Sequence, residues 1–516
     1  MSTSTTSPAR SDNSVGTQST KSGNYMARVT KRWNDVQVLA RKRDLSTDAV
    51  HEPVTDSADY ISPAQPYSTD SGSLFNAGKF LIAMVGLPAT SKTLLSVAIT
   101  RYARWSGVRI ESFHITKYEA MVAGDGEFHN DSESKGDITL NGEGTFRERV
   151  LKAVTDDMAR FFRDSKGQIA IYDALNIRKR DRAFLQDKFS KYDIKVVFIE
   201  SIVTDPLLLK ENIEIATKSK DYEGWDRQKA IANYKRKITA KESLYQTIEA
   251  TENVCYVKYI NAGRDIIVNN NNYGYLVNKI VFFLMNLKHK RGCVYFARCG
   301  RSDRDRYTDD EVLNEEGLRY SKLLTDIVIN RIKRNNRKAK EQSESQGEVN
   351  SEDGTDFDPR SLVVWAAPRK RTYDSGLFFQ EQGVELRKRS QLKQMHPGVV
   401  ADMTDEEIKE KYPEEYREYL KDPYHYRYTR AESYHDLAIR MEPLLLEIEH
   451  MSQNILIIAH DSTLRVLYGY FMACTSSEVP YLEFTREFLT EISFSPFCNT
   501  VERIPITQQT LDEYLR

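Results

Sequence analysis

The segment between Val85 and Leu94 has the residue types of a phosphate-binding loop. Such a loop points backbone N–H groups at phosphate oxygens, its lysine reaches the outer phosphates, and its Ser or Thr holds Mg²⁺. That pattern has glycine before the lysine, whereas this chain has Ser91. The spacing therefore fits both a P-loop lacking one glycine and an ordinary strand–turn–helix. The residues that we predict to bind nucleotide here are Gly86, Leu87, Pro88, Ala89, Thr90, Ser91, Lys92 and Thr93.

A carboxylate suited to the same chemistry is Asp173, which directly follows the apolar run from Ile169 to Tyr172. Phosphotransferases place a carboxylate at such a strand end, where it holds Mg²⁺ or the acceptor hydroxyl. We therefore predict Thr93 and Asp173 as metal ligands. A solvated aspartate at the end of a strand would give the same local sequence.

The order of apolar runs and helical segments predicts an α/β fold in two domains, with parallel strands and right-handed crossovers. In the first domain we expect helices at 93–105 and 145–162, a loop insertion at 121–144, and strands at 80–85, 108–113, 168–173 and 194–200. The second domain begins at Cys293, and there we expect strands at 294–299, 361–365 and 454–459.

Composition marks the domain boundaries. Residues 1–76 are rich in Ser, Thr, Asp and Pro and show no apolar period, which predicts a disordered tail. The first domain is then expected over 77–288 and the second over 293–505, with a short polar linker between them. Within the second domain, residues 335–356 are too polar to bury and predict a mobile charged loop.

The charge and cysteine content disfavour several classes of protein. The 516 residues carry 74 Lys and Arg against 75 Asp and Glu, so no basic field would attract nucleic acid or a membrane. The five cysteines form no Cys-X-X-Cys pair, which disfavours a zinc ribbon. The polar N-terminus and the short apolar runs indicate neither a secretion signal nor a membrane span. We therefore predict a cytoplasmic protein with no nucleic-acid and no membrane partner.

Longer motifs occur in both halves of the chain. Those in the first half are Met84 to Ala89, Lys92-Thr93, Arg101-Tyr102, Trp105, Asp173 to Asn176, Phe198 to Ile202 and Asp205-Pro206. Those in the second half are Tyr412 to Glu415, Tyr426 to Tyr428, Glu432 to Tyr434 and Pro480 to Leu482. In this order they resemble the bifunctional 6-phosphofructo-2-kinase/fructose-2,6-bisphosphatase family over about residues 78–500.

The resemblance implies a P-loop kinase domain with a parallel sheet, followed by a histidine-phosphatase domain like that of the phosphoglycerate mutases. The first domain would use ATP and Mg²⁺ to phosphorylate the 2-hydroxyl of fructose 6-phosphate. The second would hydrolyse fructose 2,6-bisphosphate through a phosphohistidine. By analogy with the family, the chain would form a homodimer through its kinase domain.

In the first domain the resemblance makes Lys92 and Asp173 catalytic residues and adds Asn212 and Lys218 to the nucleotide site. Arg147 matches a family arginine that holds the sugar phosphate, whereas Lys237 and Lys241 stand where the family has an Arg and a Tyr. We predict that these three residues, Arg147, Lys237 and Lys241, bind the sugar phosphate. Several family residues are replaced. Thr90-Ser91 replaces the family's Arg-Gly pair before the lysine, and Tyr118-Glu119-Ala120 replaces its Tyr-Arg-Arg segment. Leu175 replaces a threonine, and Val203 replaces a cysteine.

In the second domain the family's Arg-His-Gly-Glu is replaced by Arg298-Cys299-Gly300-Arg301, so the nucleophilic histidine is Cys299. The expected general acid is Gln394, whose amide cannot give a proton to a leaving alkoxide. Substrate-anchoring Asn, Arg and Lys residues are replaced by Asp305, Tyr419 and Pro423. The degenerate phosphatase pocket that we predict consists of Arg298, Cys299, Arg371, Gln394, His460 and Arg465.

These replacements lead to one hypothesis and two alternatives. We hypothesise a divergent homologue linked to fructose 2,6-bisphosphate metabolism, a pseudoenzyme with an inactive bisphosphatase and weak or absent kinase activity. The first alternative is an active ATP-dependent 6-phosphofructo-2-kinase whose rearranged sugar-phosphate site uses Lys237 and Lys241. A P-loop kinase for another substrate is disfavoured because the similarity spans both domains. Cys299 as a thiolate nucleophile is disfavoured because cysteine phosphatases have an arginine where this chain has Asp305.

Overall fold

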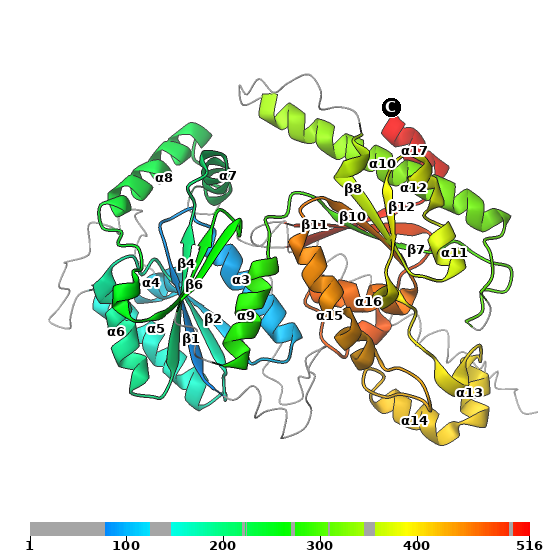
Figure 1. Cartoon of the computed structure of the whole chain (residues 1–516), viewed down its shortest axis with the longest axis horizontal. Coiled ribbons are helices and arrows are strands. Elements are labelled where there is room, and N and C mark those ends of the chain that lie inside the picture. The colour runs from blue at the N-terminus through cyan, green and yellow to red at the C-terminus, as the bar shows by residue number, and fades with distance from the viewer. Residues whose placement is uncertain are drawn as a thin grey trace, which may run out of the picture.

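The computed structural model describes residues 78–123, 146–218, 222, 224–269, 274–307, 310–344, 357–494 and 499–515. Two α/β domains lie side by side (Figure 1). The tail predicted over 1–76 lies outside these residues, as does the part of the predicted insertion from 124 onward. Among the described residues, no helix has the length and apolar character needed to cross a membrane.

The first domain is built on a six-stranded sheet. Its strands are β1 (Phe80–Val85), β2 (Ile110–His114), β3 (Ile169–Asp173), β4 (Lys195–Ile202), β5 (Cys255–Ile260) and β6 (Asp265–Asn269). Their order is β2-β3-β1-β4-β5-β6, and β6 pairs antiparallel with β5 while the other pairs are parallel. Every residue of the central strand β1 is buried, as a strand covered on both faces requires.

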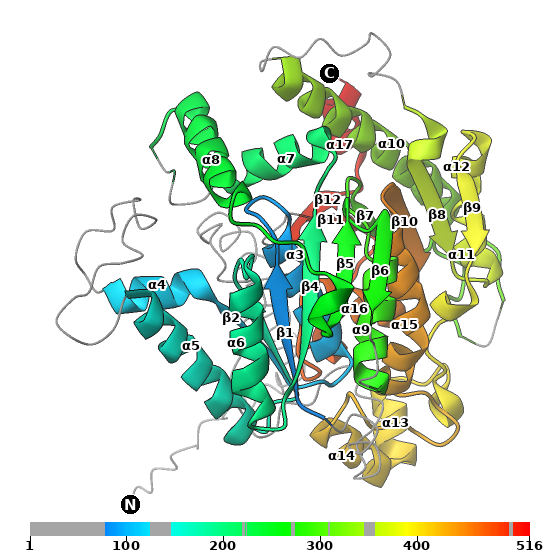
Figure 2. The same cartoon turned by 60° about the vertical axis from the view of Figure 1, so that its left-hand side comes forward.

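Helices lie on both faces of this sheet and beyond its carboxyl edge. They are α3 (Lys92–Trp105), α4 (Ile115–Ala123), α5 (Phe146–Arg163), α6 (Lys179–Ser190), α7 (Pro206–Ala216), α8 (Arg227–Glu242) and α9 (Tyr275–Asn286). Ile82 of β1 packs in a core with α3 and α9, whereas its neighbour Leu81 packs in a second core with α5 and α6. Helices α7 and α8 lie beyond the carboxyl end of β1 (Figure 2).

The second domain also contains a six-stranded sheet, in the order β12-β11-β7-β10-β8-β9. Its strands are β7 (Val294–Arg298), β8 (Leu362–Ala366), β9 (Glu385–Lys388), β10 (Asn454–Ala459), β11 (Phe488–Phe494) and β12 (Asn499–Pro505). Helices α10 (Glu315–Glu344), α12 (Leu377–Glu381) and α17 (Gln508–Leu515) cover one face, and α15 (Tyr434–His450) and α16 (Asp461–Phe471) cover the other. The shorter helices are α11 (Lys370–Asp374), α13 (Asp405–Lys411) and α14 (Pro413–Lys421).

Two of the predicted loops are partly helical. The prediction of a charged loop over 335–356 is wrong for residues 335–344, because α10 continues to Glu344. Residues 345–356 lie outside the described residues. Residues 335–344 are rich in Lys, Arg, Glu, Gln and Ala, which are strong helix formers even where a segment is too polar to bury. The insertion predicted from 121 begins later as well, since α4 ends at Ala123.

One hydrophobic core crosses the boundary between the domains. It contains Ile99 and Tyr102 of α3 and Phe283 of α9 together with Leu445 of α15 and Phe471 of α16. The rings of Tyr102 and Phe283 stack with centroids 4.4 Å apart. Helix α3 therefore packs on its own sheet and also on the second domain.

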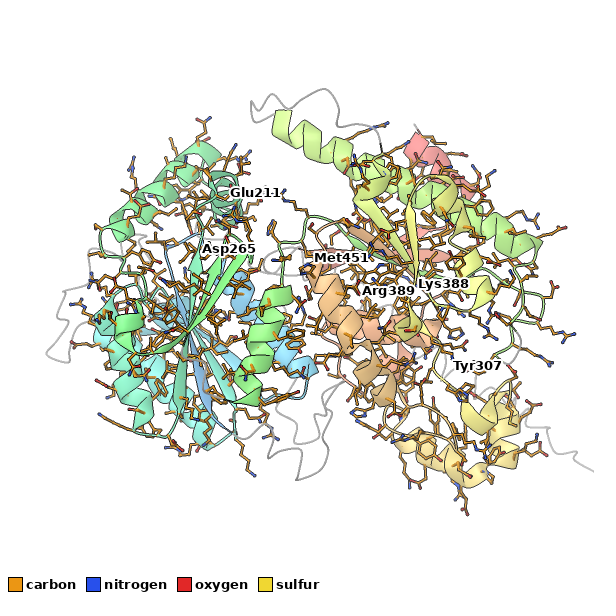
Figure 3. The ribbon with its side chains drawn as sticks, viewed as in Figure 1. Glu211, Asp265, Tyr307, Lys388, Arg389 and Met451 are labelled. Atoms are coloured by element: carbon orange, nitrogen blue, oxygen red, sulfur yellow. The ribbon has the colours of Figure 1, made fainter. Side chains whose placement is uncertain are left out.

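A buried ion pair lies at the same boundary. Arg101 Nη2 donates to Glu449 Oε1 at 2.6 Å, and the two side chains are 9% and 1% exposed. The Tyr470 hydroxyl donates to the same oxygen at 2.8 Å. Met451, labelled in Figure 3, directly follows α15, and its carbonyl oxygen accepts a bond from Lys290 Nζ. Burial by itself raises the pKa of Glu449, but the charges of Arg101 and Lys290 hold it below its ordinary value.

Replacing Glu449 tests the strength of this boundary. We expect Glu449→Gln to lower the free energy of unfolding by about 3–5 kcal/mol, because it leaves Arg101 buried without a countercharge. A denaturant titration of the full chain measures this loss. The control is Asp164→Asn, which removes a carboxylate that pairs with Arg163 on the surface and should leave the midpoint unchanged. Equal midpoints for Glu449→Gln and the wild type would contradict the expectation.

Candidate functional sites

The predicted phosphate-binding loop joins β1 to α3 at the carboxyl edge of the sheet. Gly86 has a φ of 141°, and a Cβ at this position would lie 2.5 Å from the carbonyl oxygen of Ser201. Only glycine fits there, because both the backbone angle and the contact exclude a side chain. The loop then turns back on itself, so that Lys92 Nζ donates to the carbonyl oxygen of Leu87 at 2.5 Å.

Ser91 has a left-handed backbone conformation, which explains why the usual motif has glycine at this position. Its φ of 63° and ψ of 21° are left-handed, a region that costs a non-glycine residue roughly 1–3 kcal/mol. Asn212 of α7 supports the loop, since it accepts a bond from Ser91 Oγ at 3.1 Å and donates one to the Ala89 carbonyl at 2.8 Å. Asn212, expected to touch nucleotide, thus contacts the loop itself, and Lys218 lies exposed just beyond α7.

Asp173 lies beside this loop and is buried. Thr93 Oγ1 donates to Asp173 Oδ2 at 2.8 Å, and His114 Nδ1 lies 3.0 Å from the same oxygen. Burial by itself raises the pKa of Asp173, but the bond and charge of His114 and the charge of Lys92 hold it below its ordinary value. Burial lowers the pKa of Lys92 to about 8, even though the charge of Asp173 acts in the opposite direction. The structure therefore brings Lys92, Thr93 and Asp173 together as predicted.

His114 is a member of this site that the sequence reasoning missed. It ends β2, and its position is in register with Asp173 at the end of the neighbouring strand β3. Both side chains are more than nine-tenths buried. The sequence held a partial signal, because His114 directly follows the strand predicted at 108–113 and Asp173 ends the strand predicted at 168–173. The pairing of these two strands was not known from the sequence.

The predicted sugar-phosphate residues are only partly brought together. Arg147 Nη2 donates to Asp181 Oδ1 at 2.9 Å, and its side chain is 53% exposed. Burial raises the pKa of Glu119, while the charge of Lys241 lowers it, so these two side chains lie near each other. Lys237 instead lies over the ring of Tyr222, with its Nζ 5.3 Å from the ring centroid. Arg147 and Lys241 thus each have a carboxylate neighbour.

The second candidate site lies at the carboxyl ends of β7 and β10. Cys299 follows β7 and is 1% exposed, and His460 caps α16. Burial lowers the pKa of His460 well below its ordinary value, and nearby arginines lower it further. These arginines include three of the predicted pocket residues and one that was missed, namely Arg298, Arg371, Arg465 and Arg486. The structure therefore brings His460 and these four arginines near one another in strongly cationic surroundings.

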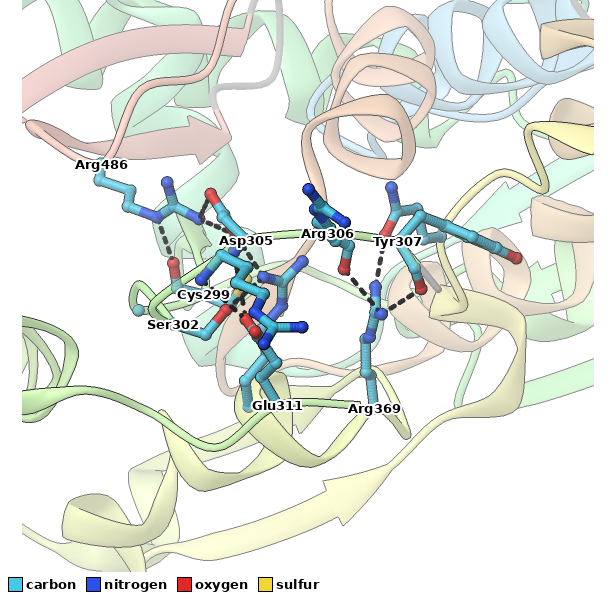
Figure 4. Close-up of polar contacts among 12 residues, drawn as sticks. Cys299, Ser302, Asp305, Arg306, Tyr307, Glu311, Arg369 and Arg486 are labelled. Carbon is cyan, nitrogen blue, oxygen red and sulfur yellow. Dashed lines mark hydrogen bonds and ion pairs between the residues drawn. The ribbon is translucent and has the colours of Figure 1, made fainter. Parts of the chain in front are cut away.

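One carboxylate and one amide of this region bond to arginines. Asp305 Oδ1 accepts a bond from Arg371 Nη1, and Asp305 Oδ2 accepts one from Arg486 Nη2 at 2.9 Å (Figure 4). Gln394 Oε1 accepts a bond from Arg369 Nη1 at 3.2 Å. Arg369 and Arg486 carried no motif that sequence reasoning could use, since their roles depend on loops that meet only in the folded chain.

Comparison with known proteins identifies the family. Residues 67–291 match the model described as 6-phosphofructo-2-kinase, and residues 340–507 match that of the histidine phosphatase superfamily (branch 1). A Saccharomyces cerevisiae protein named putative 6-phosphofructo-2-kinase/fructose-2,6-bisphosphatase is 54% identical over 492 residues, which cover 94% of this chain and 95% of that protein. The chain belongs to the 6-phosphofructo-2-kinase/fructose-2,6-bisphosphatase family. Membership confirms the resemblance found in the motifs and the predicted order of a P-loop kinase domain and a histidine-phosphatase domain.

Other members of the 6-phosphofructo-2-kinase/fructose-2,6-bisphosphatase family are more distant. The Saccharomyces cerevisiae fructose-2,6-bisphosphatase is 30% identical over 458 residues, covering 87% of this chain and 93% of that protein. The human 6-phosphofructo-2-kinase/fructose-2,6-bisphosphatase 1 is 31% identical over 418 residues, covering 79% of this chain and 80% of that protein. The similarity therefore spans both domains in each case.

The 6-phosphofructo-2-kinase half of the family implies ATP and a divalent metal ion as cofactors. The loop of this chain fits a nucleotide, because it offers a helix N-terminus, the Gly86 turn and the Lys92 amine beside the Thr93–Asp173 pair. Among the described residues, no group of three or more His, Cys, Asp or Glu side chains is placed to hold a metal ion. Thr93 and Asp173 would hold Mg²⁺, which would neutralise the negative charge that develops on the phosphate oxygens during phosphoryl transfer.

Removing the Ser91 side chain should strengthen nucleotide binding. We expect Ser91→Gly to tighten Mg-ATP binding, because glycine lets phosphate oxygens approach the loop backbone closely while Asn212 still holds Ala89. Calorimetry on the full chain measures the dissociation constant. Ser243→Gly, at a helix end with an ordinary φ of −63°, is the matched control and should not change it. Submicromolar affinity in the wild type would mean that Ser91 is accommodated without loss.

Proposed function

We propose that this family member has lost fructose-2,6-bisphosphatase activity, retains weak or no 6-phosphofructo-2-kinase activity, and acts by binding nucleotide or sugar phosphate. The observation that carries the first part is the identity of the groups at the second site. Cys299 stands where the family has its nucleophilic histidine, and it is buried. Gln394 stands where the family has its general acid, and its amide oxygen is bonded to Arg369. A phosphohistidine cannot form at Cys299, and the amide of Gln394 cannot protonate the leaving oxygen.

The sugar-phosphate site supports the second part of the proposal. Glu119 replaces a family arginine, and its partly buried carboxyl group has Lys241 as a neighbour. A sugar phosphate carries up to about two negative charges at neutral pH. An anion pair at about 4 Å costs about 4 kcal/mol at an effective dielectric of 20, which weakens binding roughly a thousandfold. Arg147 is the remaining family arginine at this site, and it is bonded to Asp181.

The alternative function, an active 6-phosphofructo-2-kinase, is favoured by the first site alone. Thr93 Oγ1 donates to Asp173, His114 lies beside the same carboxylate oxygen, and the charge of Asp173 acts on Lys92. These groups support phosphoryl transfer if an acceptor binds, because the reaction depends on positioning and charge stabilisation. The acceptor therefore decides between the two functions.

We also propose that a second copy of this chain binds the first domain. The edge strand β6 exposes Ile267 and Val268, which are 48% and 39% exposed. Helix α9 exposes Tyr275, Phe282 and Met285, each more than half exposed. Apolar side chains on an open sheet edge favour pairing with another chain.

The bisphosphatase proposal is tested with labelled fructose 2,6-bisphosphate. We expect the purified full chain to release no phosphate above a blank, because neither the nucleophile nor the acid is present. Cys299→Ala should behave identically. Phosphate release by the wild type that disappears in Cys299→Ala would contradict the proposal and establish the thiolate as a nucleophile.

The kinase proposal is tested with Mg-ATP and fructose 6-phosphate. We expect no measurable transfer by the wild type and partial recovery in the double variant Glu119→Arg with Ser91→Gly, because the variant restores the cation and relieves the loop. The matched control is Glu148→Arg with Ser91→Gly, which adds the same charge at an exposed position on α5. Robust wild-type transfer that Lys92→Ala or Asp173→Ala abolishes would establish the alternative function instead.

A further inference from the structure

The loop between β7 and α10 holds the backbone of Asp305 in a defined conformation. Asp305 has a left-handed φ of 54°. The backbone N–H groups of Arg304 and Asp305 both donate to Glu311 Oε2 at 3.1 Å. Because the backbone on this loop is bonded to Glu311, the direction of the Asp305 side chain follows from the fold rather than from a flexible surface position.

The Asp305 carboxylate is bonded to two arginines of the second site. Arg371 Nη1 donates to Oδ1, and Arg486 Nη2 lies 3.1 Å from Oδ1 and 2.9 Å from Oδ2 (Figure 4). Arg371 is 1% exposed and also donates to Ser302 Oγ at 2.8 Å. Arg486 Nε donates to the carbonyl oxygen of Cys299 at 2.8 Å, which ties the same group to the end of β7.

The cations around this carboxylate converge on a buried position. Arg298, Arg371, Arg465 and Arg486 all act on His460. Within the described residues, the Nε atoms of Arg298, Arg371 and Arg465 and the Nδ1 atom of His460 are buried and have no hydrogen-bond partner. Arginines gathered at one position, two of them bonded to a carboxylate, form an arrangement that suits an anion.

We propose that Asp305 is an intramolecular ligand of the second site, where its carboxylate replaces the anion and excludes phosphate monoesters. A phosphate monoester presents oxygens to arginines as a carboxylate does, and both favour paired N–H donors. An entering phosphate therefore has to displace Asp305 from Arg371 and Arg486 or remain next to a like charge. Asp305 is thus the residue that decides whether this site accepts a dianion.

This inference deepens the proposed function, on which it rests, and it concerns binding rather than turnover. The probe is inorganic phosphate, titrated calorimetrically into the full chain. We expect Asp305→Asn to bind phosphate at least about tenfold more tightly than the wild type, because the amide removes the competing charge. Asp305→Glu keeps the charge and should bind as weakly as the wild type. Asp303→Asn, on an exposed residue of the same loop, should also match the wild type.

Equal phosphate affinity in the wild type and Asp305→Asn would overturn the proposal. If Asp305→Asn does not fold, Glu311→Ala releases the two backbone N–H groups that hold the loop, and tighter phosphate binding in that variant is the expected result; no change there would also overturn it. Hydrolysis of fructose 2,6-bisphosphate by Asp305→Asn but not by the wild type would support the assignment of Asp305 as the residue that excludes the anion, and would refute Cys299 and Gln394 as the cause of the lost activity. Hydrolysis by the wild type itself would refute the proposed function and leave the phosphate titration to test Asp305.

Discussion

The buried ion pair between Arg101 and Glu449 holds the two halves of this protein in one arrangement. Arg101 belongs to α3, the helix that begins directly after the phosphate-binding loop, and Glu449 belongs to α15 of the second domain. Burying two charges is unfavourable unless both are paired and bonded, so this contact tolerates few alternative arrangements of the domains. The position of α3, and with it the direction of Lys92 and Thr93, is therefore set partly by the second domain.

The two candidate sites share a physical principle: groups of the chain itself bond to atoms that would otherwise face a ligand. In the first site Asn212 bonds to the phosphate-binding loop, and Lys92 bonds to the carbonyl oxygen of Leu87. In the second site Asp305 bonds to two arginines. Such internal partners satisfy polar atoms and favour the folded chain. An anion that binds Lys92, Arg371 or Arg486 has to compete with the internal acceptors Leu87 and Asp305.

Elements with strong local signals were predicted from the sequence, and pairings between distant segments were not. The apolar run of β1 and the strand end at Asp173 were predicted because a strand buried on both faces is apolar throughout. His114 was missed because its role depends on the register between β2 and β3. Arg486 was missed for the same kind of reason, since it lies far along the chain from Asp305. The short helix α4 was partly read as a loop because it precedes a segment rich in Gly, Asp and Ser.

The hydrophobic core that crosses the domain boundary restricts how the gene for this protein can evolve. Ile99 and Phe283 on one side and Leu445 and Phe471 on the other are all buried against the opposite domain's cluster. A gene split that encoded either half alone would expose this apolar surface to water, and large exposed apolar patches favour aggregation. Each half therefore constrains the sequence of the other, because a change that unfolds one half also exposes the apolar interface of its partner half.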